Sequence, residues 1–270
     1  MTLDERNDWP TAWTPDSKAV LFHSDRSGNY DIYKQALDQD SAEPLVASPR
    51  ADWIARLSPD ASWIVYESAA QPEDLGTSAP SELRRVPMSG GPSQLVLTTR
   101  GYVDHRCARA PSTLCLVGEQ TEDQKQLVVT AFDPVKGRGR EVARIATNPS
   151  FVYNWDLSPD GSQIAMQVPP GENRFRLLPL TGGASRDLAV KGWFHFDDGP
   201  DWSSDGKGFY VSSRSPKGVR LLYIDLKGNV TAVWQQQGSL RTWALPSPDG
   251  RHLAILGYTV DSNVWMIENF

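Results

Sequence analysis

The sequence predicts an all-β fold: a six-bladed β-propeller made of four-stranded antiparallel blades. A turn with an aspartate recurs along the 270-residue chain, with its aspartates at positions 16, 60, 160, 205 and 249, and proline precedes the aspartate in every copy except the one at 205. Successive steps are 44, 100, 45 and 44 residues, and the long step fits two repeats of 50. A period in the mid-forties combined with short strands is typical of a propeller, with one blade for each repeat.

The fourth repeat shows how one copy forms a blade. A short inner strand at 153–157 is followed by the turn Ser-Pro-Asp-Gly at 158–161 and an apolar returning strand at 164–166. Proline and aspartate suit the central positions of a type I turn, and glycine suits the left-handed position that follows. An alternating strand at 174–178 and an outer strand at 186–190 complete the blade.

The other repeats follow the same order. Their third strands are predicted at 30–33, 82–86, 126–129, 220–224 and 263–267. The third repeat has a degenerate turn near 110–113. Ser17 and Ala61 replace the turn glycine in the first two repeats, and a positive φ there costs about 1 kcal/mol each.

Six blades of about 45 residues use the whole chain, so we expect a single domain over 1–270. The expected blades span 6–48, 49–98, 99–147, 148–191, 192–236, and 237–270 plus 1–5. After position 267 only three residues remain, so the last blade lacks a fourth strand. The N-terminal segment is therefore predicted to complete that blade and close the ring, which removes two open sheet edges.

The net charge of −6 and the pI near 5.3 provide no basic field for nucleic acid. No apolar run has the length of a membrane span, and the N-terminus has no signal-peptide pattern. We therefore expect no nucleic-acid partner, no membrane partner and a cytoplasmic location, for a complete protein or for a segment of a longer one. A closed ring needs no second subunit, so the protein is expected to be a monomer.

Cys107 and Cys115 lie on either side of the degenerate turn of the third repeat. Two reduced thiols are the expectation for a cytoplasmic protein, and a cross-strand disulfide is the alternative. Without histidine partners at a fixed spacing, the two cysteines do not form a zinc motif.

Ten tryptophans are many for this length, and six lie in or beside the inner strands: Trp9, Trp13, Trp53, Trp155, Trp202 and Trp243. Their repeated position indicates packing residues. The alternative is an aromatic platform for carbohydrate.

Two stretches carry a family resemblance. The sequence Trp-Ser-Ser-Asp-Gly-Lys at 202–207 and the stretch from Ser24 to Tyr33 resemble the TolB-type propeller repeat over nearly the whole chain. The resemblance implies the propeller fold and a role in binding protein partners. Bacterial propellers of this kind often follow DNA-binding or kinase domains in larger proteins, and related propellers cover the active site of peptidases. None of those attached domains is present in this sequence.

Propellers bind ligands at one end of the central channel, and polar residues at the start of each inner strand are expected to ring that end. The candidate ligand-binding residues are Asp8, Asp52, Arg56, Arg106, Asn154, Asp156, Asp198, Asp201 and Arg241. Aspartate also favours loops and caps for purely structural reasons.

Two segments combine an imidazole with carboxylates: Asp104-His105 and His195-Phe196-Asp197. Such sets can bind a divalent cation, or can pair a general base with an orienting acid. Asp104, His105, His195 and Asp197 are therefore the candidate catalytic residues and also the candidate ligands of calcium or zinc in the channel.

Motifs for a hydrolase nucleophile or for a nucleotide are absent from the sequence. The sequence therefore favours a binding module for a protein or a small molecule, as part of a bacterial regulatory protein. The alternative is an ester or phosphoester hydrolase that uses a channel cation to activate water, and only the fold links the chain to that chemistry.

Overall fold

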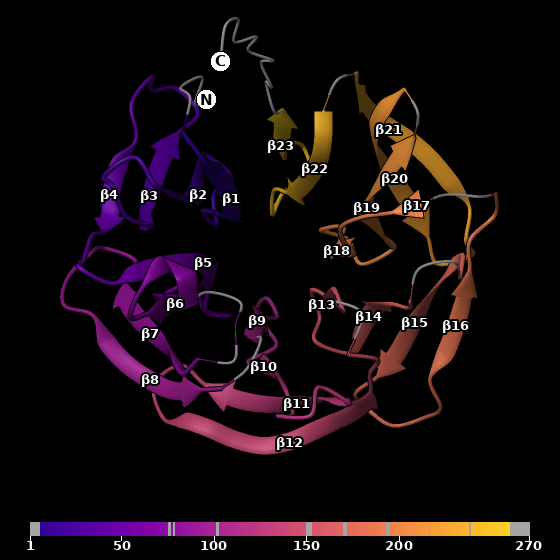
Figure 1. Cartoon of the computed structure of the whole chain (residues 1–270), viewed down its shortest axis with the longest axis horizontal. Helices are drawn as coiled ribbons and strands as arrows, with labels where there is room; N and C mark the ends of the chain where they lie inside the picture. Colours follow the sequence, from indigo (N-terminus) through magenta and orange to yellow (C-terminus); the bar gives the residue numbers. More distant parts are fainter. Residues whose placement is uncertain are drawn as a thin grey trace, which may run out of the picture.

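Four-stranded antiparallel sheets are arranged as wedges around a central axis in the computed structural model of the chain (Figure 1). The structure describes residues 6–74, 77, 79–100, 103–149, 153–169, 172–192, 195–215, 217–237 and 239–259. The architecture is a β-propeller, as the sequence predicts. A 3-10 turn over Pro72–Asp74 is the one helical element of this part of the chain.

The strands of each blade run outward from the axis in chain order. The first blade contains β1 (Asp8–Trp13), β2 (Ala19–Ser24), β3 (Asp31–Ala36) and β4 (Glu43–Val46). The second contains β5 (Ala51–Leu57), β6 (Trp63–Ala69), β7 (Ser81–Pro87) and β8 (Gln94–Thr99). The third contains β9 (Val103–Cys107), β10 (Cys115–Gln120), β11 (Gln126–Asp133) and β12 (Gly137–Ala146). The fourth contains β13 (Trp155–Leu157), β14 (Gln163–Gln167), β15 (Arg174–Pro179) and β16 (Arg186–Ala189).

The fifth blade differs because its inner strand is divided. Two short strands, β17 (His195–Phe196) and β18 (Asp201–Trp202), both pair with β19. The outer strands are β19 (Gly208–Ser215), β20 (Gly218–Asp225) and β21 (Val230–Gln236). Asp197 and Asp198 still bond to β19, since Asp197 N donates to Ser212 O at 3.1 Å and Ser212 N donates to Asp198 O at 2.8 Å, and the inner strand is interrupted before Asp201.

The prediction of six complete blades is corrected to five. The sixth sheet has two strands in the described residues, β22 (Ser239–Pro246) and β23 (Leu253–Thr259). This sheet adjoins the first blade, because Trp13 Nε1 donates to Leu245 O at 2.8 Å and Asp249 N donates to Ser17 Oγ at 3.2 Å. The predicted strand at 263–267 and the predicted ring closure by residues 1–5 lie outside the described residues.

The repeated turn has one geometry wherever it occurs. In the fourth blade Ser158 Oγ donates to Asp160 Oδ1 at 2.6 Å, and the same oxygen accepts from Ser162 N at 3.0 Å. The following Gly161 has a φ of 75°. Hydroxyl-to-aspartate bonds recur in the other four copies, and the residue after each aspartate is again left-handed. This bonding explains why the aspartate repeats, because it satisfies the turn's backbone amides.

Replacing Ala61 with glycine is expected to stabilise the protein by about 0.5–1 kcal/mol. Ala61 has a φ of 56°, a conformation that glycine adopts without steric cost. The measurement is the free energy of unfolding in urea. Ser17→Gly is the comparison, since Ser17 has a φ of 59° but its hydroxyl also accepts from Asp249. A smaller gain at Ser17 than at Ala61 is expected, and a destabilised Ala61→Gly protein would contradict this account of the turn.

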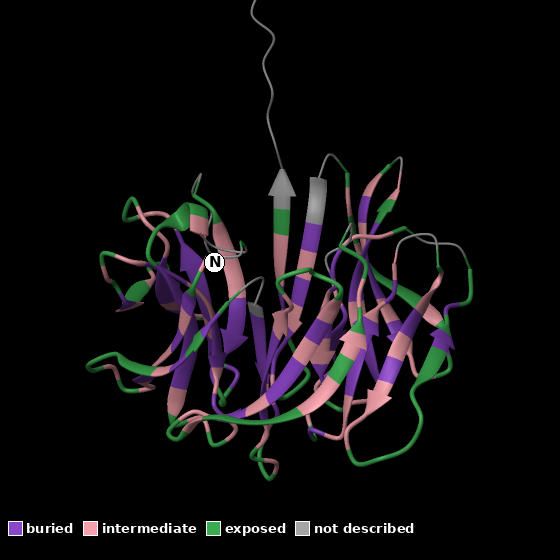
Figure 2. Ribbon diagram, turned by 60° about the horizontal axis from the view of Figure 1, so that its bottom comes forward, coloured by how far each residue is buried: buried purple, intermediate pink, exposed green. Residues whose placement is uncertain are grey.

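The hydrophobic core consists of layers between neighbouring blades. Figure 2 shows the exposed residues mostly on the outer strands and in the turns. One layer joins the third and fourth blades, where Leu116 and Val129 pack with Trp155 and Ile164. The Trp155 indole lies directly on Gly118, where a Cβ would be 2.9 Å from it. Outer strands such as β12 and β16 are mostly exposed. None of the helical structure in the described residues is long and apolar enough to span a membrane.

Cys107 and Cys115 form a disulfide, so the expectation of two reduced thiols is wrong. The two residues are direct partners in the antiparallel register of β9 and β10, with their Cα atoms 4.0 Å apart. The turn between these strands contains the predicted degenerate copy of the repeat. The disulfide therefore cross-links the inner strand of the third blade to its neighbour.

Candidate functional site

A cavity of about 740 Å³ opens where the inner strands begin, at the predicted end of the channel. Inner strands and the loops between second and third strands both contribute to it, including Pro72 from the second blade and Pro169 from the fourth. This volume lies in the usual range for small-molecule sites.

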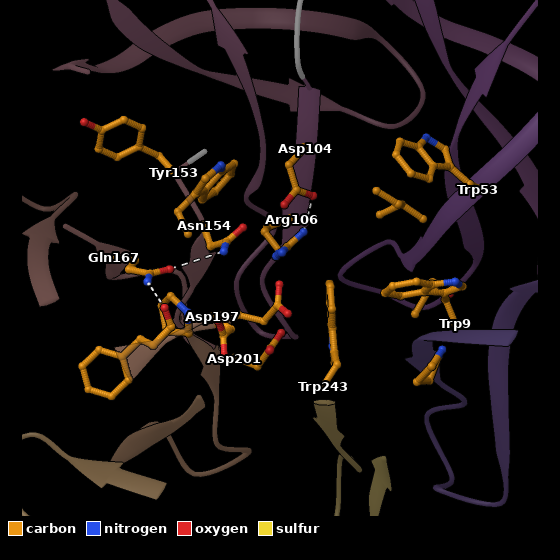
Figure 3. Close-up of a pocket in the computed structure, with 18 of the residues that line it drawn as sticks. Trp9, Trp53, Asp104, Arg106, Tyr153, Asn154, Gln167, Asp197, Asp201 and Trp243 are labelled. Carbon is orange, nitrogen blue, oxygen red and sulfur yellow. Dashed lines mark hydrogen bonds and ion pairs between the residues drawn. The ribbon is translucent and has the colours of Figure 1, made fainter. Parts of the chain in front are cut away.

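The two sides of the cavity differ in chemistry (Figure 3). The indoles of Trp9, Trp53 and Trp243 lie on one side, and they come from the first, second and sixth sheets. Asn154, Gln167, Asp197 and Asp201 lie on the other side, with Asp104 and Arg106 between the two groups. The cavity thus joins an aromatic wall to a polar, acidic one.

Arg106 is the centre of a buried charge cluster at the base of the cavity. Its Nη1 donates to Asp104 Oδ1, and its Nε lies 2.9 Å from Asp156 Oδ1 as an ion pair. The Arg106 side chain is 9% exposed. Burial works against its charge, but Asp104 and Asp156 outweigh burial and raise the pKa of Arg106. Asp156 Oδ2 also accepts from Trp202 N at 2.8 Å, which joins the fourth blade to the fifth.

Arg56 lies beside this cluster on β5. Its Nη1 donates to Thr11 O of the first blade, and burial together with the nearby Arg106 lowers the pKa of Arg56 to about 10. Arg56, Arg106 and Asp201 line a second cavity of about 410 Å³ as well. That cavity is surrounded by the proline–aspartate turns at the opposite end of the inner strands. The charge cluster therefore separates two cavities along the axis.

Asp201 at the start of β18 is 7% exposed and lines both cavities. Burial and the neighbouring carboxylate of Asp156 raise the pKa of Asp201 to about 8, although Arg106 and Arg56 oppose the shift. Burial raises the pKa of Asp156 too. The cluster therefore contains three carboxyl groups and two guanidinium groups. The carboxyl groups belong to Asp104, Asp156 and Asp201.

A strained segment of β5 forms part of the aromatic wall. Ile54 has a φ of 46°, which is a genuine outlier for a β-branched residue. The strand register shifts between Trp53 and Arg56, as at a β-bulge, and such bulges re-aim side chains beside functional sites. His23 Nδ1 accepts from Ile54 N at 3.4 Å, and burial lowers the pKa of His23 to about 3. A neutral His23 therefore supports the strained backbone of the wall.

The interrupted inner strand of the fifth blade places Asp197 at the rim. Arg214 Nη2 lies 3.2 Å from Asp197 Oδ1, and His195 Nε2 lies 3.6 Å from the same oxygen. Burial raises the pKa of Asp197, while Arg214 and His195 oppose that rise. His195 is largely exposed, so this arrangement is a surface triad at the edge of the cavity.

Eight of the predicted residues line the cavity: Arg56, Asp104, Arg106, Asn154, His195, Asp197, Asp198 and Asp201. Asp156 lies behind them in the charge cluster and lines the second cavity. The side chain of Arg241 lies outside what the structure describes.

Three predicted residues have other positions. His105 is fully buried, and its Nε2 lies 3.1 Å from Val65 O of the second blade. Alternation along β9 directs Asp104 and Arg106 to the axis and His105 to the adjacent blade. Asp8 is paired with Arg26 at 2.8 Å, and Asp52 accepts from Ser48 Oγ at 2.7 Å. Neither Asp8 nor Asp52 is among the residues that line the mouth cavity.

The residues expected to hold a metal do not come together as one ligand set. Within the described residues, no three His, Cys, Asp or Glu side chains lie close enough to hold a metal ion. His195 and Asp197 lie together at the rim, whereas Asp104 pairs with Arg106 and His105 contacts Val65 of the second blade. We therefore derive no chemical step through a cation.

The sequence indicated that the six inner-strand tryptophans are packing residues. The structure divides these tryptophans into two groups. Trp13, Trp155 and Trp202 are buried. Trp9, Trp53 and Trp243 are half-buried and line the cavity. Position within the repeat separates the two groups, because the cavity tryptophans lie six or seven residues before the turn aspartate and the buried ones three to five residues before it.

No family model matches the chain, and no curated protein matches it in sequence. Solved structures match in fold. TolB from Acinetobacter baumannii has a TM-score of 0.65 and 18% identity, covering 86% of this chain and 56% of that protein. A putative TolB from Agrobacterium tumefaciens has a TM-score of 0.66 and 18% identity, covering 95% and 92%. An oligogalacturonate lyase from Vibrio parahaemolyticus has a TM-score of 0.62 and 15% identity, covering 98% and 75%.

The chain thus has the fold of TolB-like propellers, as its repeats predict. It spans a little over half the length of the Acinetobacter protein, 56%. Similar propellers occur in a nidogen/laminin complex and in a mitotic checkpoint complex, and others belong to a puromycin hydrolase and to prolyl endopeptidases. At identities below 20% these similarities concern the fold alone.

Proposed function

We propose that this propeller is a binding module whose ligand, a small molecule or a segment of a protein partner, occupies the mouth cavity. The cavity itself is the observation that carries the proposal: about 740 Å³, with an aromatic wall facing a polar one. Concave sites with apolar walls and a few convergent polar groups are the usual form of ligand sites.

Backbone strain at the cavity supports the same proposal. A β-branched residue at positive φ costs of order 1–3 kcal/mol, and such strain clusters at ligand sites. Ile54 bears this strain between Trp53 and Arg56, which both line the cavity. The TolB-like fold and the propellers found in protein complexes are consistent with binding to a protein.

Hydrolysis is the second candidate, and one feature favours it. Asp201 has its pKa raised to about 8 by burial and by Asp156, and a shifted carboxyl in a cavity is a candidate general acid. No serine or cysteine is among the described residues of the cavity wall to act as nucleophile. A calcium or zinc ion that activates water is the remaining form of this proposal. Thermal stability with added calcium, zinc or manganese tests it, and stabilisation together with ester turnover is the supporting result.

Ligand capture with matched tryptophan variants tests the binding proposal. The purified protein is incubated with a bacterial extract and separated by gel filtration, and the co-eluting molecules are identified by mass spectrometry. Trp53→Ala removes part of the aromatic wall and is expected to reduce recovery of the ligand about tenfold or more. Trp234→Ala is the control, because Trp234 lies on the outer strand β21. Equal recovery by both variants, or no ligand on the wild-type protein, would contradict a function in the cavity.

The two-stranded β22–β23 sheet lies between the first and fifth blades (Figure 1). The monomeric state and the cytoplasmic location stay predictions. Disulfides persist mainly in oxidising compartments, so the Cys107–Cys115 bond is a reason to test that location by cell fractionation.

A further inference from the structure

Asp201 is a buried carboxyl group that faces the cavity. No hydrogen bond or ion pair to its carboxyl group is found among the described residues, although the side chain lies at the base of the cavity. Buried carboxylates are ordinarily paired or hydrogen-bonded, because an unpaired buried charge is costly. The side chain therefore offers its carboxyl group to a ligand in the cavity.

The charge balance around Asp201 indicates the sign of that group. Asp104 and Asp156 both bind Arg106, and Arg56 is the second guanidinium of the cluster. Asp198 also faces Asp201. Among the described residues around Asp201, carboxyl groups therefore outnumber the two guanidinium groups, and an additional positive charge would complement the set. An anionic ligand would instead be repelled by the carboxyl groups of Asp104, Asp156 and Asp201.

The opposite wall suits an organic cation. Trp9, Trp53 and Trp243 present indoles to the cavity, across from Asp201 (Figure 3). Cations bind to indole faces through cation–π attraction, which is worth about 0.5–2 kcal/mol per contact. A hydrated metal ion gains little from three indoles, whereas an alkylammonium or guanidinium group with an apolar body gains from both walls.

We propose that the mouth cavity binds an organic monocation, an ammonium or guanidinium group whose charge lies at the Asp201 carboxylate and whose apolar part lies on Trp9, Trp53 and Trp243. This inference rests on the proposed function and names its ligand class. A small amine and a lysine or arginine side chain of a partner protein share this chemistry. The cavity volume accommodates either one.

Binding of such a cation is linked to a proton. The charged groups that face Asp201 are Asp156 on β13, Arg106 on β9, Arg56 on β5 and Asp198 in the preceding loop. Together with burial they raise the pKa of Asp201 to about 8, so at pH 7 most molecules carry a neutral carboxyl there. The cation favours the ionised form, and its binding therefore releases a proton below about pH 8.

Benzyltrimethylammonium is the probe, because a quaternary ammonium does not titrate. We expect its affinity, measured by calorimetry, to fall about tenfold per pH unit below pH 7 and to level off above pH 9. Near pH 7 its binding should release close to one proton, seen as a dependence of the heat on the buffer's ionisation enthalpy. An affinity that does not vary between pH 6 and 9 would overturn the role of Asp201.

Substitutions in each wall distinguish the contribution of the acidic wall to binding of the probe from that of the aromatic wall. Asp201→Asn is expected to weaken binding of the probe at pH 9 at least tenfold and to abolish proton release. Trp243→Ala is expected to weaken binding several-fold while proton release persists. Asp205→Asn, at an exposed turn of the same blade, is the control and should leave both unchanged. Unaltered binding by Asp201→Asn would refute the proposal.

The source of the cation is distinguished by two further probes. Acetyl-Gly-Lys-Gly-amide and acetyl-Gly-Arg-Gly-amide represent a partner's side chain, with acetyl-Gly-Gln-Gly-amide as the neutral control. Tighter binding of a cationic peptide than of benzyltrimethylammonium indicates a protein partner, and the reverse order indicates a small amine. If none of the cationic probes binds but the extract experiment still recovers a ligand through Trp53, the ligand class is wrong and the binding function stands.

Discussion

Replacing Arg106 with methionine is expected to destabilise the protein by about 3–5 kcal/mol, because two buried carboxylates lose their cation. Asp104 and Asp156 both pair with Arg106, whose side chain is 9% exposed. Removal of one partner from a buried ion pair costs far more than the pair's net contribution. Urea unfolding at pH 7 measures the change in the free energy of unfolding.

Arg214→Met is the matched control for Arg106→Met. Arg214 also pairs with an aspartate of the cavity, at 3.2 Å from Asp197 Oδ1, but its side chain is 56% exposed. Exposed ion pairs contribute about 0–1 kcal/mol, so this variant should retain nearly the stability of the wild type. Adding Asp156→Asn to Arg106→Met is expected to recover part of the loss. Equal losses for Arg106→Met and Arg214→Met would mean that the cluster at the base of the cavity is not a buried network.

Replacing Asp201 with asparagine is expected to change how stability depends on pH. The folded-state pKa of Asp201 is raised to about 8 by burial and Asp156, above the ordinary value of 3.8. Between these values the folded protein binds one proton more than the unfolded chain at this site. Its contribution to stability is complete below about pH 4 and is lost as the pH rises toward 8, by up to about 1.4 kcal/mol per unit.

The test compares the stabilities of the wild-type protein and Asp201→Asn from pH 5 to pH 8. The difference is expected to shift steadily in favour of Asp201→Asn as the pH rises. Asp205→Asn is the control, because hydrogen bonds from Ser203 and the Lys207 amide lower the pKa of Asp205. A lowered pKa affects stability only as the pH falls through the acidic range, so the Asp205→Asn difference should be constant from pH 5 to pH 8. A constant difference for Asp201→Asn as well would show that Asp201 is ionised at neutral pH.

The blades were predictable because each repeat carries its own turn chemistry. Ser158 and Asp160 bond to each other and to the turn backbone, and this local arrangement fixes where the inner strand ends. The divided inner strand of the fifth blade was not predictable, since it depends on where pairing with β19 is interrupted between Asp198 and Asp201. The cysteine pairing depends on cross-strand register, which places Cys107 opposite Cys115.

The position of the candidate site could be predicted from the sequence. Which side chains line it was harder to predict. Ring symmetry brings the first residues of the inner strands together, and Asp104, Asp197 and Asp201 all reach the cavity. His105 does not, because side chains alternate along a strand and it lies between two residues that face the axis. The aromatic wall was missed although the repeat carries a signal for it, because Trp53 lies seven residues before its turn aspartate and the buried Trp155 lies five residues before its own.

Arg56, Arg106 and Asp201 line both cavities, so the same charged side chains belong to the two ends of the axis. A ligand in the mouth cavity that changes the charge or position of these side chains also changes the wall of the second cavity. The shared cluster therefore couples the two faces of the propeller electrostatically.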